Sequence, residues 1–211
     1  MGYAATAVAG ARRPLNAEKA LHKRVMDRRQ WAVKRLPGMD PMMLAFDTLD
    51  PRFVRMRDHL AALCGGRRMP RRADLDPQAF ADVLPYVNLI DVVLANDAVR
   101  FRFRLVGTAQ SAAAQLDYAG RFVDDVVDPA SRPRVLDDLA RVVATGLPQY
   151  GRYGMPFPGR GFLESERVFY PLSEDGRMVD CILALHRYPD LPIAIATDWH
   201  LAAWRRAIPP L

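Results

Sequence analysis

An alternation of arginine with apolar residues is the feature that most constrains what this chain can fold into. From residue 99 to residue 108 the sequence reads VRFRFRLVGT. Neighbouring side chains of a β-strand point to opposite faces of a sheet, so this period of two predicts a strand with one apolar face and one cationic face. We expect the apolar set to point into the domain, namely Phe101, Phe103 and Leu105. The arginines should then point away from it, namely Arg100, Arg102 and Arg104.

Similar patterns predict four more strands and a helical segment between them. The run over 86–94 pairs with the first strand as a β-hairpin, and further strands are expected over 149–156, 162–171 and 178–187. Asp50 followed by Pro51 begins a helix over 51–63, and Gly146 ends the clearest helix of the chain. The order of two strands, several helices and three strands indicates an α+β fold.

The positive charge of the chain is concentrated towards its N-terminus. The formal net charge is +6, yet residues 1–72 hold 16 Lys and Arg against 6 Asp and Glu, and the remainder holds 14 against 18. The remainder is therefore mildly acidic, which argues against nucleic acid as its partner. We divide the chain into a basic N-terminal extension with one helix (1–49), a folded domain (50–190) and a C-terminal tail (191–211). The basic helix, expected over 16–36, could be solvated, dock on an acidic partner or on the sheet, or rest on lipid or nucleic acid.

No arrangement of residues in the sequence is typical of an enzyme. The four histidines are scattered, and there is no nucleophile elbow, phosphate-binding glycine loop or HExxH motif. Glu164 and Glu166 lie two residues apart on one strand face, where exposure to water or pairing with arginine explains them better than catalysis does. Cys64 and Cys181 form no CxxC motif, so the sequence indicates neither a metal site nor a redox centre.

The sequence also lacks the features of a membrane-inserted or exported chain. No apolar run approaches the roughly 20 residues that a membrane-spanning helix needs. The N-terminus does not show the basic-then-apolar order of a signal peptide. We therefore expect no transmembrane segment, a cytoplasmic location and two reduced thiols.

Three short motifs resemble those of a known family. They are PRRADLDP (70–77), LPYVNLIDV (84–92) and FRFRLVGT (101–108), and in this order they resemble the short stand-alone PAS-domain proteins of bacteria, found mostly in alphaproteobacteria. The segment YAGRFVDDVVDPASRPRVLDDLARVVATGLPQY (118–150) is similar to the Gly-Arg step, Pro-bearing loop and glycine-capped long helix of PAS domains. The resemblance covers about residues 50–187. It implies a PAS-like five-stranded antiparallel sheet with helices on one face, to which this chain adds N-terminal helices.

The resemblance also disfavours two cofactors found in PAS proteins. Haem-binding members that use a proximal histidine carry it on the long helix, and residues 121–146 contain no histidine. Photoactive flavin-binding members need a cysteine in the helical region, and both cysteines of this chain lie outside it. The cofactor is left unknown, and a bound metabolite stays open.

Two candidate sites follow from the strand patterns. A ligand pocket between sheet and helices would be lined by apolar side chains, which could equally fill that space as core: Phe101, Phe103, Leu105, Phe169, Leu183 and Leu185. An interaction surface on the outward face of the sheet would comprise Arg100, Arg102, Arg104 and Ile182. Asp91, Glu164 and Glu166 are the expected partners of these arginines, whose stems can cover apolar surface. A phosphate-binding role is the alternative, but no stacking aromatics share that face.

Together these features predict a non-catalytic PAS-type sensor or interaction module that binds a small molecule or a protein partner. The alternative is a small nucleic-acid-associated regulator that uses the basic N-terminal region. We also expect a homodimer that uses the outer face of the sheet, the N-terminal helices, or both. The reason is that the strand over 178–187 is apolar on both sides and would leave an apolar set on the outer face of the sheet. The alternative is that the chain's own helix over 51–63 covers that face.

Overall fold

Five antiparallel strands form one sheet in the order β2-β1-β5-β4-β3. The computed structural model describes residues 49–95 and 98–189, so the helix expected over 16–36 and the tail 191–211 lie outside the described residues. The strands are β1 (Val87–Ala95), β2 (Ala98–Val106), β3 (Gln149–Gly154), β4 (Glu164–Leu172) and β5 (Cys181–Arg187). The predicted α+β fold and the five-stranded antiparallel sheet are confirmed.

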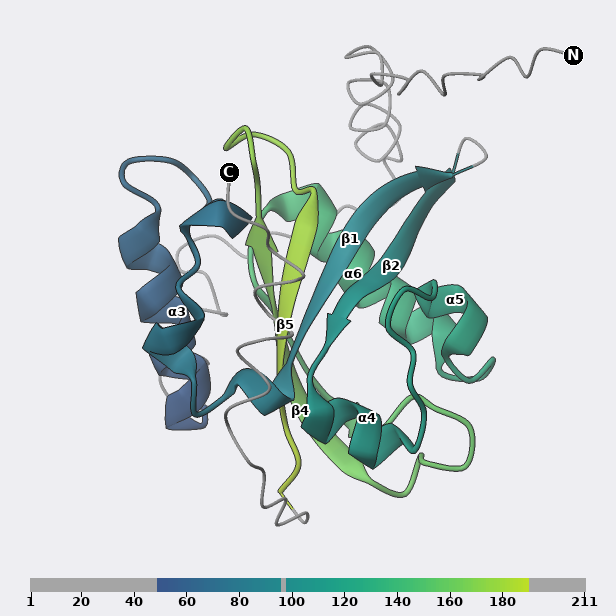
Figure 1. The fold of residues 1–211 in the computed structure, drawn as a ribbon. Coiled ribbons are helices and arrows are strands. Elements are labelled where there is room, and N and C mark those ends of the chain that lie inside the picture. Colours follow the sequence, from purple (N-terminus) through teal and green to yellow (C-terminus); the bar gives the residue numbers. More distant parts are fainter. Residues whose placement is uncertain (1–48, 96–97, 190–211) are drawn as a thin grey trace, which may run out of the picture.

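Helices cover both faces of this sheet (Figure 1). On one face lie α4 (Thr108–Ala114), α5 (Val123–Val126) and α6 (Arg132–Thr145). On the other lies α3 (Pro51–Leu63), followed by the short 3-10 helices η2 (Arg72–Asp74), η3 (Pro77–Phe80) and η4 (Leu84–Tyr86). As expected, α3 begins at Asp50, whose side chain accepts a hydrogen bond from the Arg52 backbone N–H at 3.0 Å. As expected too, α6 ends at Gly146, which adopts the left-handed conformation with φ of 62°.

An irregularity in β2 changes the direction of one predicted side chain. Ile90 pairs with Phe103 while Leu89 pairs with Leu105, so Arg104 is an extra residue in β2, as in a β-bulge. Phe101 and Phe103 point towards the helices α4 to α6, as the alternation predicts. Beyond the bulge Leu105 is also buried, but it lies in the cluster on the α3 face. The prediction that Leu105 shares a face with Phe101 was therefore wrong.

The two faces of β5 are the reverse of the expected ones. Ile182 is fully buried and belongs to the cluster on the helix α6 side, together with Leu139. Leu183 and Leu185 belong to the cluster on the opposite face, where they pack with Phe53 of α3. Ile182 is therefore no part of an interaction surface, and that part of the prediction was wrong. Both faces of the strand are apolar because both are covered, as in sheets buried on two sides.

The helix α3 is attached to the sheet by polar contacts as well as by apolar ones. The Tyr170 hydroxyl of β4 donates a hydrogen bond to the Phe53 carbonyl at 2.7 Å. The guanidinium of Arg187, at the end of β5, lies 2.9 Å from the Asp50 carboxylate that caps α3. The alternative that the chain's own helix covers the outer face is therefore the one that the structure supports. Within residues 49–95 and 98–189, the helices are too short or too polar to cross a lipid bilayer.

Candidate ligand-binding cavity

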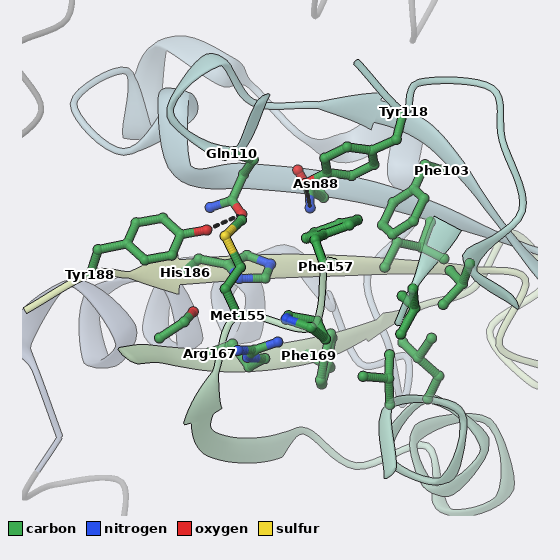
Figure 2. A pocket seen from close by; sticks show the side chains of 17 residues that line it. Asn88, Phe103, Gln110, Tyr118, Met155, Phe157, Arg167, Phe169, His186 and Tyr188 are labelled. Carbon is green, nitrogen blue, oxygen red and sulfur yellow. Dashed lines mark hydrogen bonds between the residues drawn. The ribbon is translucent and has the colours of Figure 1, made fainter. Parts of the chain in front are cut away.

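A small cavity lies between the sheet and the helices α4 to α6. Its volume is about 30 Å³, which is room for about two water molecules. One end is lined by aromatic rings, including Phe103, Tyr118 and Phe157, and polar groups of Gln110, His186 and Tyr188 lie at the other end (Figure 2). Aliphatic side chains of α5 and α6 complete the apolar wall, namely Val123, Val135 and Leu139.

Hydrogen bonds of Gln110 and Asn88 fix the polar groups on the α4 side of the cavity. The Tyr188 hydroxyl donates to the Gln110 side-chain oxygen at 2.5 Å, and the Gln110 amide donates to the Tyr86 carbonyl at 3.3 Å. Asn88 accepts from the backbone N–H of Gly107 at 3.1 Å and lies 3.4 Å from the Tyr118 hydroxyl. A side chain at Gly107 would place its Cβ 2.3 Å from the Pro85 carbonyl oxygen. The glycine of the FRFRLVGT motif therefore lets β2 turn closely past η4 into α4.

The wall contributed by β4 and β5 carries three buried polar side chains. Ser165 and Arg167 lie on β4, and Arg167 is paired in register with His186 of β5. Arg167 is 2% exposed and His186 is 8% exposed. The Arg167 guanidinium lies 3.8 Å from the centroid of the Tyr153 ring, and its Nη2 donates to the Tyr153 carbonyl at 3.1 Å. Its Nε, the Nε2 of His186 and the hydroxyl of Ser165 have no hydrogen-bond partner.

Burial sets the protonation of these groups. Desolvation, and after it the positive charge of Arg167, hold the pKa of His186 well below its ordinary value. The imidazole is therefore neutral at pH 7, with one N–H donor. Burial raises the pKa values of Tyr118 and Tyr188, so both phenols stay protonated. The cavity thus contains hydrogen-bond donors and one permanent positive charge, and no carboxylate lines it.

The structure brings only part of the predicted pocket together. Phe103 and Phe169 line the cavity, and Phe101 belongs to the same cluster without lining it. Leu105, Leu183 and Leu185 lie on the α3 face of the sheet, so their assignment to this pocket was wrong. The reasons are the bulge at Arg104 and the double-sided burial of β5, which strand alternation alone does not reveal.

The three arginines of β2 are partly exposed, and each has at least one acidic partner. Asp91 of β1 accepts from Arg102 Nη2 at 3.0 Å and from Arg104 Nε at 2.6 Å. Arg100 reaches the carboxylates of α5 instead, at 2.8 Å from Asp124 and 2.7 Å from Asp125. Asp91 was thus correctly predicted as a partner. Glu164 and Glu166 pair with other arginines, namely Arg152 and Arg187.

The family of the chain follows from its sequence as well as from this fold. A family model described as PAS domain matches residues 52–185, more than half of the chain. The chain belongs to the PAS domain family. A PAS domain is a sensory or signalling module, which confirms the prediction of a PAS-type module at this level. No curated protein matches the sequence.

Several solved structures resemble this PAS domain at low sequence identity. The light-state structure of the blue-light photoreceptor Aureochrome1 LOV has 10% identity and a TM-score of 0.39, over 61% of this chain and 95% of that one. The N-terminal domain of a diguanylate cyclase with PAS/PAC sensor from Marinobacter aquaeolei has 12% identity and a TM-score of 0.37, over 48% and 94%. A sensory box histidine kinase/response regulator from Burkholderia thailandensis has 11% identity and a TM-score of 0.35, over 54% and 85%.

Sequence reasoning missed most of the polar residues of this PAS cavity, above all Arg167 and His186. A signal was present in β4, where Ser165, Arg167 and Phe169 alternate with the two glutamates. A cation at the inward position beside Phe169 is unusual in a core strand, because charged side chains are seldom fully buried. Among the described residues, no three side chains of His, Cys, Asp or Glu gather as they would around a metal ion.

Proposed function

We propose that this PAS domain is a non-catalytic sensor that binds a small molecule in the cavity between the sheet and the helices α4 to α6. The observation that most directly supports this proposal is that polar side chains converge on one cavity inside an otherwise apolar core, namely Asn88, Gln110, Arg167 and His186. Burying polar groups costs free energy unless they are satisfied, so stability alone favours apolar side chains at such positions. A cavity with an apolar wall and a few convergent polar groups is typical of a ligand site.

The size of the cavity limits the ligand. A volume of about 30 Å³ is an order of magnitude below the roughly 300–1,000 Å³ of sites for drug-sized molecules and cofactors. The ligand that fits is therefore a molecule of few heavy atoms. Met155 lines the space between the polar and the aromatic ends (Figure 2). Its unbranched side chain can adopt other rotamers and so admit a somewhat larger ligand.

The proposed output is contact with a protein partner, a second copy of the chain included. The outer edge of the sheet offers a charged surface for such contact, formed by Arg102 and Arg104 around Asp91. The free thiols of Cys64 and Cys181 and the resemblance to short bacterial PAS proteins support a cytoplasmic bacterial protein. Each of these arginines already has an acidic partner, which disfavours a phosphate-binding role for this surface.

Native mass spectrometry of the purified full chain tests the proposal by detecting a bound small molecule. A second test screens metabolites of few heavy atoms for those that raise the melting temperature of the chain. The variant Val135→Phe adds volume at the wall of the cavity. Val142→Phe is the matched control, because it makes the same change on α6 at a buried residue that does not line the cavity. We expect both variants to lose some stability from overpacking. Only Val135→Phe should lose the bound molecule, and equal binding by wild type and Val135→Phe would contradict the proposal.

A further inference from the structure

Arg167 differs from the neighbouring arginines of the sheet in having no carboxylate partner. Arg152 and Arg187 both pair with Glu166 on the other face, and Arg187 lies 2.8 Å from it. Arg167 is almost fully buried, its guanidinium contacts the carbonyl and the ring of Tyr153, and it makes no ion pair among the described residues. Asp138 interacts electrostatically with Arg167 without forming an ion pair, and its carboxylate accepts a hydrogen bond from the Tyr153 hydroxyl at 3.1 Å. A buried positive charge that is not in direct contact with a carboxylate is costly.

Three buried polar atoms at the cavity lack a hydrogen-bond partner. They are Arg167 Nε, His186 Nε2 and Ser165 Oγ, out of seven such buried side-chain atoms among the described residues. Arg167 and His186 face each other across the β4–β5 pairing, and Ser165 precedes Arg167 by two residues on the same face. Ser165 lies close to the Tyr188 hydroxyl but outside good hydrogen-bond geometry, and the Tyr188 hydroxyl donates to Gln110. The three groups can therefore contact one ligand atom or group.

We propose that this triad of Arg167, His186 and Ser165 binds the carboxylate of a short-chain monocarboxylate. The inference rests on the proposed function and names the class of its ligand. Arg167 supplies the counter-charge, and Ser165 and His186 supply hydrogen bonds. The apolar wall around Phe169 and Val135 takes the short alkyl chain.

The chemistry of the triad selects a carboxylate over other anions. A guanidinium matches the planar carboxylate and forms strong charge-assisted hydrogen bonds with it. With one cation and a neutral imidazole, the site compensates one negative charge, whereas a phosphate dianion would bring a second charge into a buried space. The small volume and the apolar wall also exclude a dicarboxylate, whose second charge would lie among aliphatic side chains.

The wild-type full chain is sufficient for the first test. Binding of acetate, propionate and butyrate is measured by calorimetry and by the shift in melting temperature, with propionamide as the neutral analogue of equal size. Sodium chloride at the same ionic strength controls for salt. We expect propionate to bind at least tenfold more tightly than propionamide. Equal binding of the two, or binding of neither, would overturn the carboxylate inference, whereas the proposed small-molecule sensor is tested separately by the comparison of wild type with Val135→Phe.

A matched pair of variants assigns the charge to its residue. Arg167→Met removes the buried cation, and Arg102→Met removes a cation from the outer face of the sheet, where it pairs with Asp91. We expect Arg167→Met to abolish the preference for propionate and Arg102→Met to keep it. If Arg167→Met retains the preference for propionate over propionamide, Arg167 has only a structural role in packing against Tyr153 and the proposal is wrong. If Arg167→Met does not fold, Arg167→Lys keeps the charge without the planar fork and is expected to weaken propionate binding at least tenfold.

Discussion

At the scale of single residues, the environment of an arginine decides what it can do. Arg102 and Arg104 are partly exposed and share one carboxylate, so solvent screens their interaction with Asp91. Arg167 lies on the face of the sheet that α4 to α6 cover, where it is buried and stacks on the ring of Tyr153. The same residue type is therefore part of a surface network in one place and of the proposed ligand site in the other.

His186 gives the stability of the domain a predictable dependence on pH. Its pKa is lowered in the folded state, first by burial and then by Arg167. Below the ordinary histidine pKa of about 6.5, the unfolded chain binds a proton at this residue and the folded chain does not. Unfolding therefore becomes more favourable as the pH falls. From about pH 7.5 to 5.5 we expect a loss on the order of 1 kcal/mol in the free energy of unfolding from this residue.

Urea denaturation of ligand-free wild type and of His186→Gln at the two pH values measures this contribution. The variant should lose less stability on acidification than the wild type does. His22→Gln serves as the control, because it removes a histidine from the basic extension and should leave the pH dependence unchanged. Identical pH profiles for wild type and His186→Gln would show that His186 titrates as an ordinary histidine.

At the scale of elements, the sequence predicted which segments form strands but not how each strand faces its neighbours. The hairpin of β1 and β2 and the glycine cap of α6 follow from local pattern, since alternation and turn residues act over a few positions. The direction of Leu105 depends on the bulge at Arg104, which is visible only in the pairing of β2 with β1. The orientation of Ile182 depends on which helix covers which face of β5. The cavity depends on contacts between β4, β5 and α4, which are distant in sequence, so its polar residues were mostly missed.

The packing of α3 against the sheet predicts how a substitution changes stability on the buried side and on the exposed side of this helix. Met56 is 2% exposed and packs against the outer face of the sheet. Met56→Ala should cost about 2–5 kcal/mol of stability, as removal of large buried side chains does. Arg55→Ala, at the neighbouring position, removes an exposed side chain that pairs with Asp82 and should cost less than about 1 kcal/mol. Chemical denaturation measures both, and equal effects would mean that α3 does not contribute to the core.

At the scale of the whole molecule, the covering of both sheet faces alters the argument for a homodimer. The expected dimer relied on an apolar outer face left bare, and α3 fills that face with Phe53, Met56 and Leu60. The homodimer stays a prediction, and its interface has to use the N-terminal helices, as also expected, or another surface. The charged edge formed by Arg102, Arg104 and Asp91 is the surface that we propose for it.

The last prediction is that residues 1–45 are dispensable for folding. Both apolar clusters are built from described residues between 49 and 189, and the family match begins at residue 52. A chain without residues 1–45 should keep a cooperative thermal transition, measured by circular dichroism. Deletion of residues 1–64 is the matched control, because it also removes α3 and uncovers one face of the sheet. That longer deletion should unfold or aggregate.

The net charge of the chain without residues 1–45 determines the conditions under which its thermal unfolding is measured. Residues 1–45 hold nine Lys and Arg against three Asp and Glu, so their removal takes the formal net charge from +6 to zero. A protein without net charge associates more readily, so the melts are recorded at low protein concentration and at two concentrations of salt. A cooperative transition in the shorter deletion alone would establish a domain that begins close to Asp50. Loss of the transition in both deletions would place the basic extension in the core.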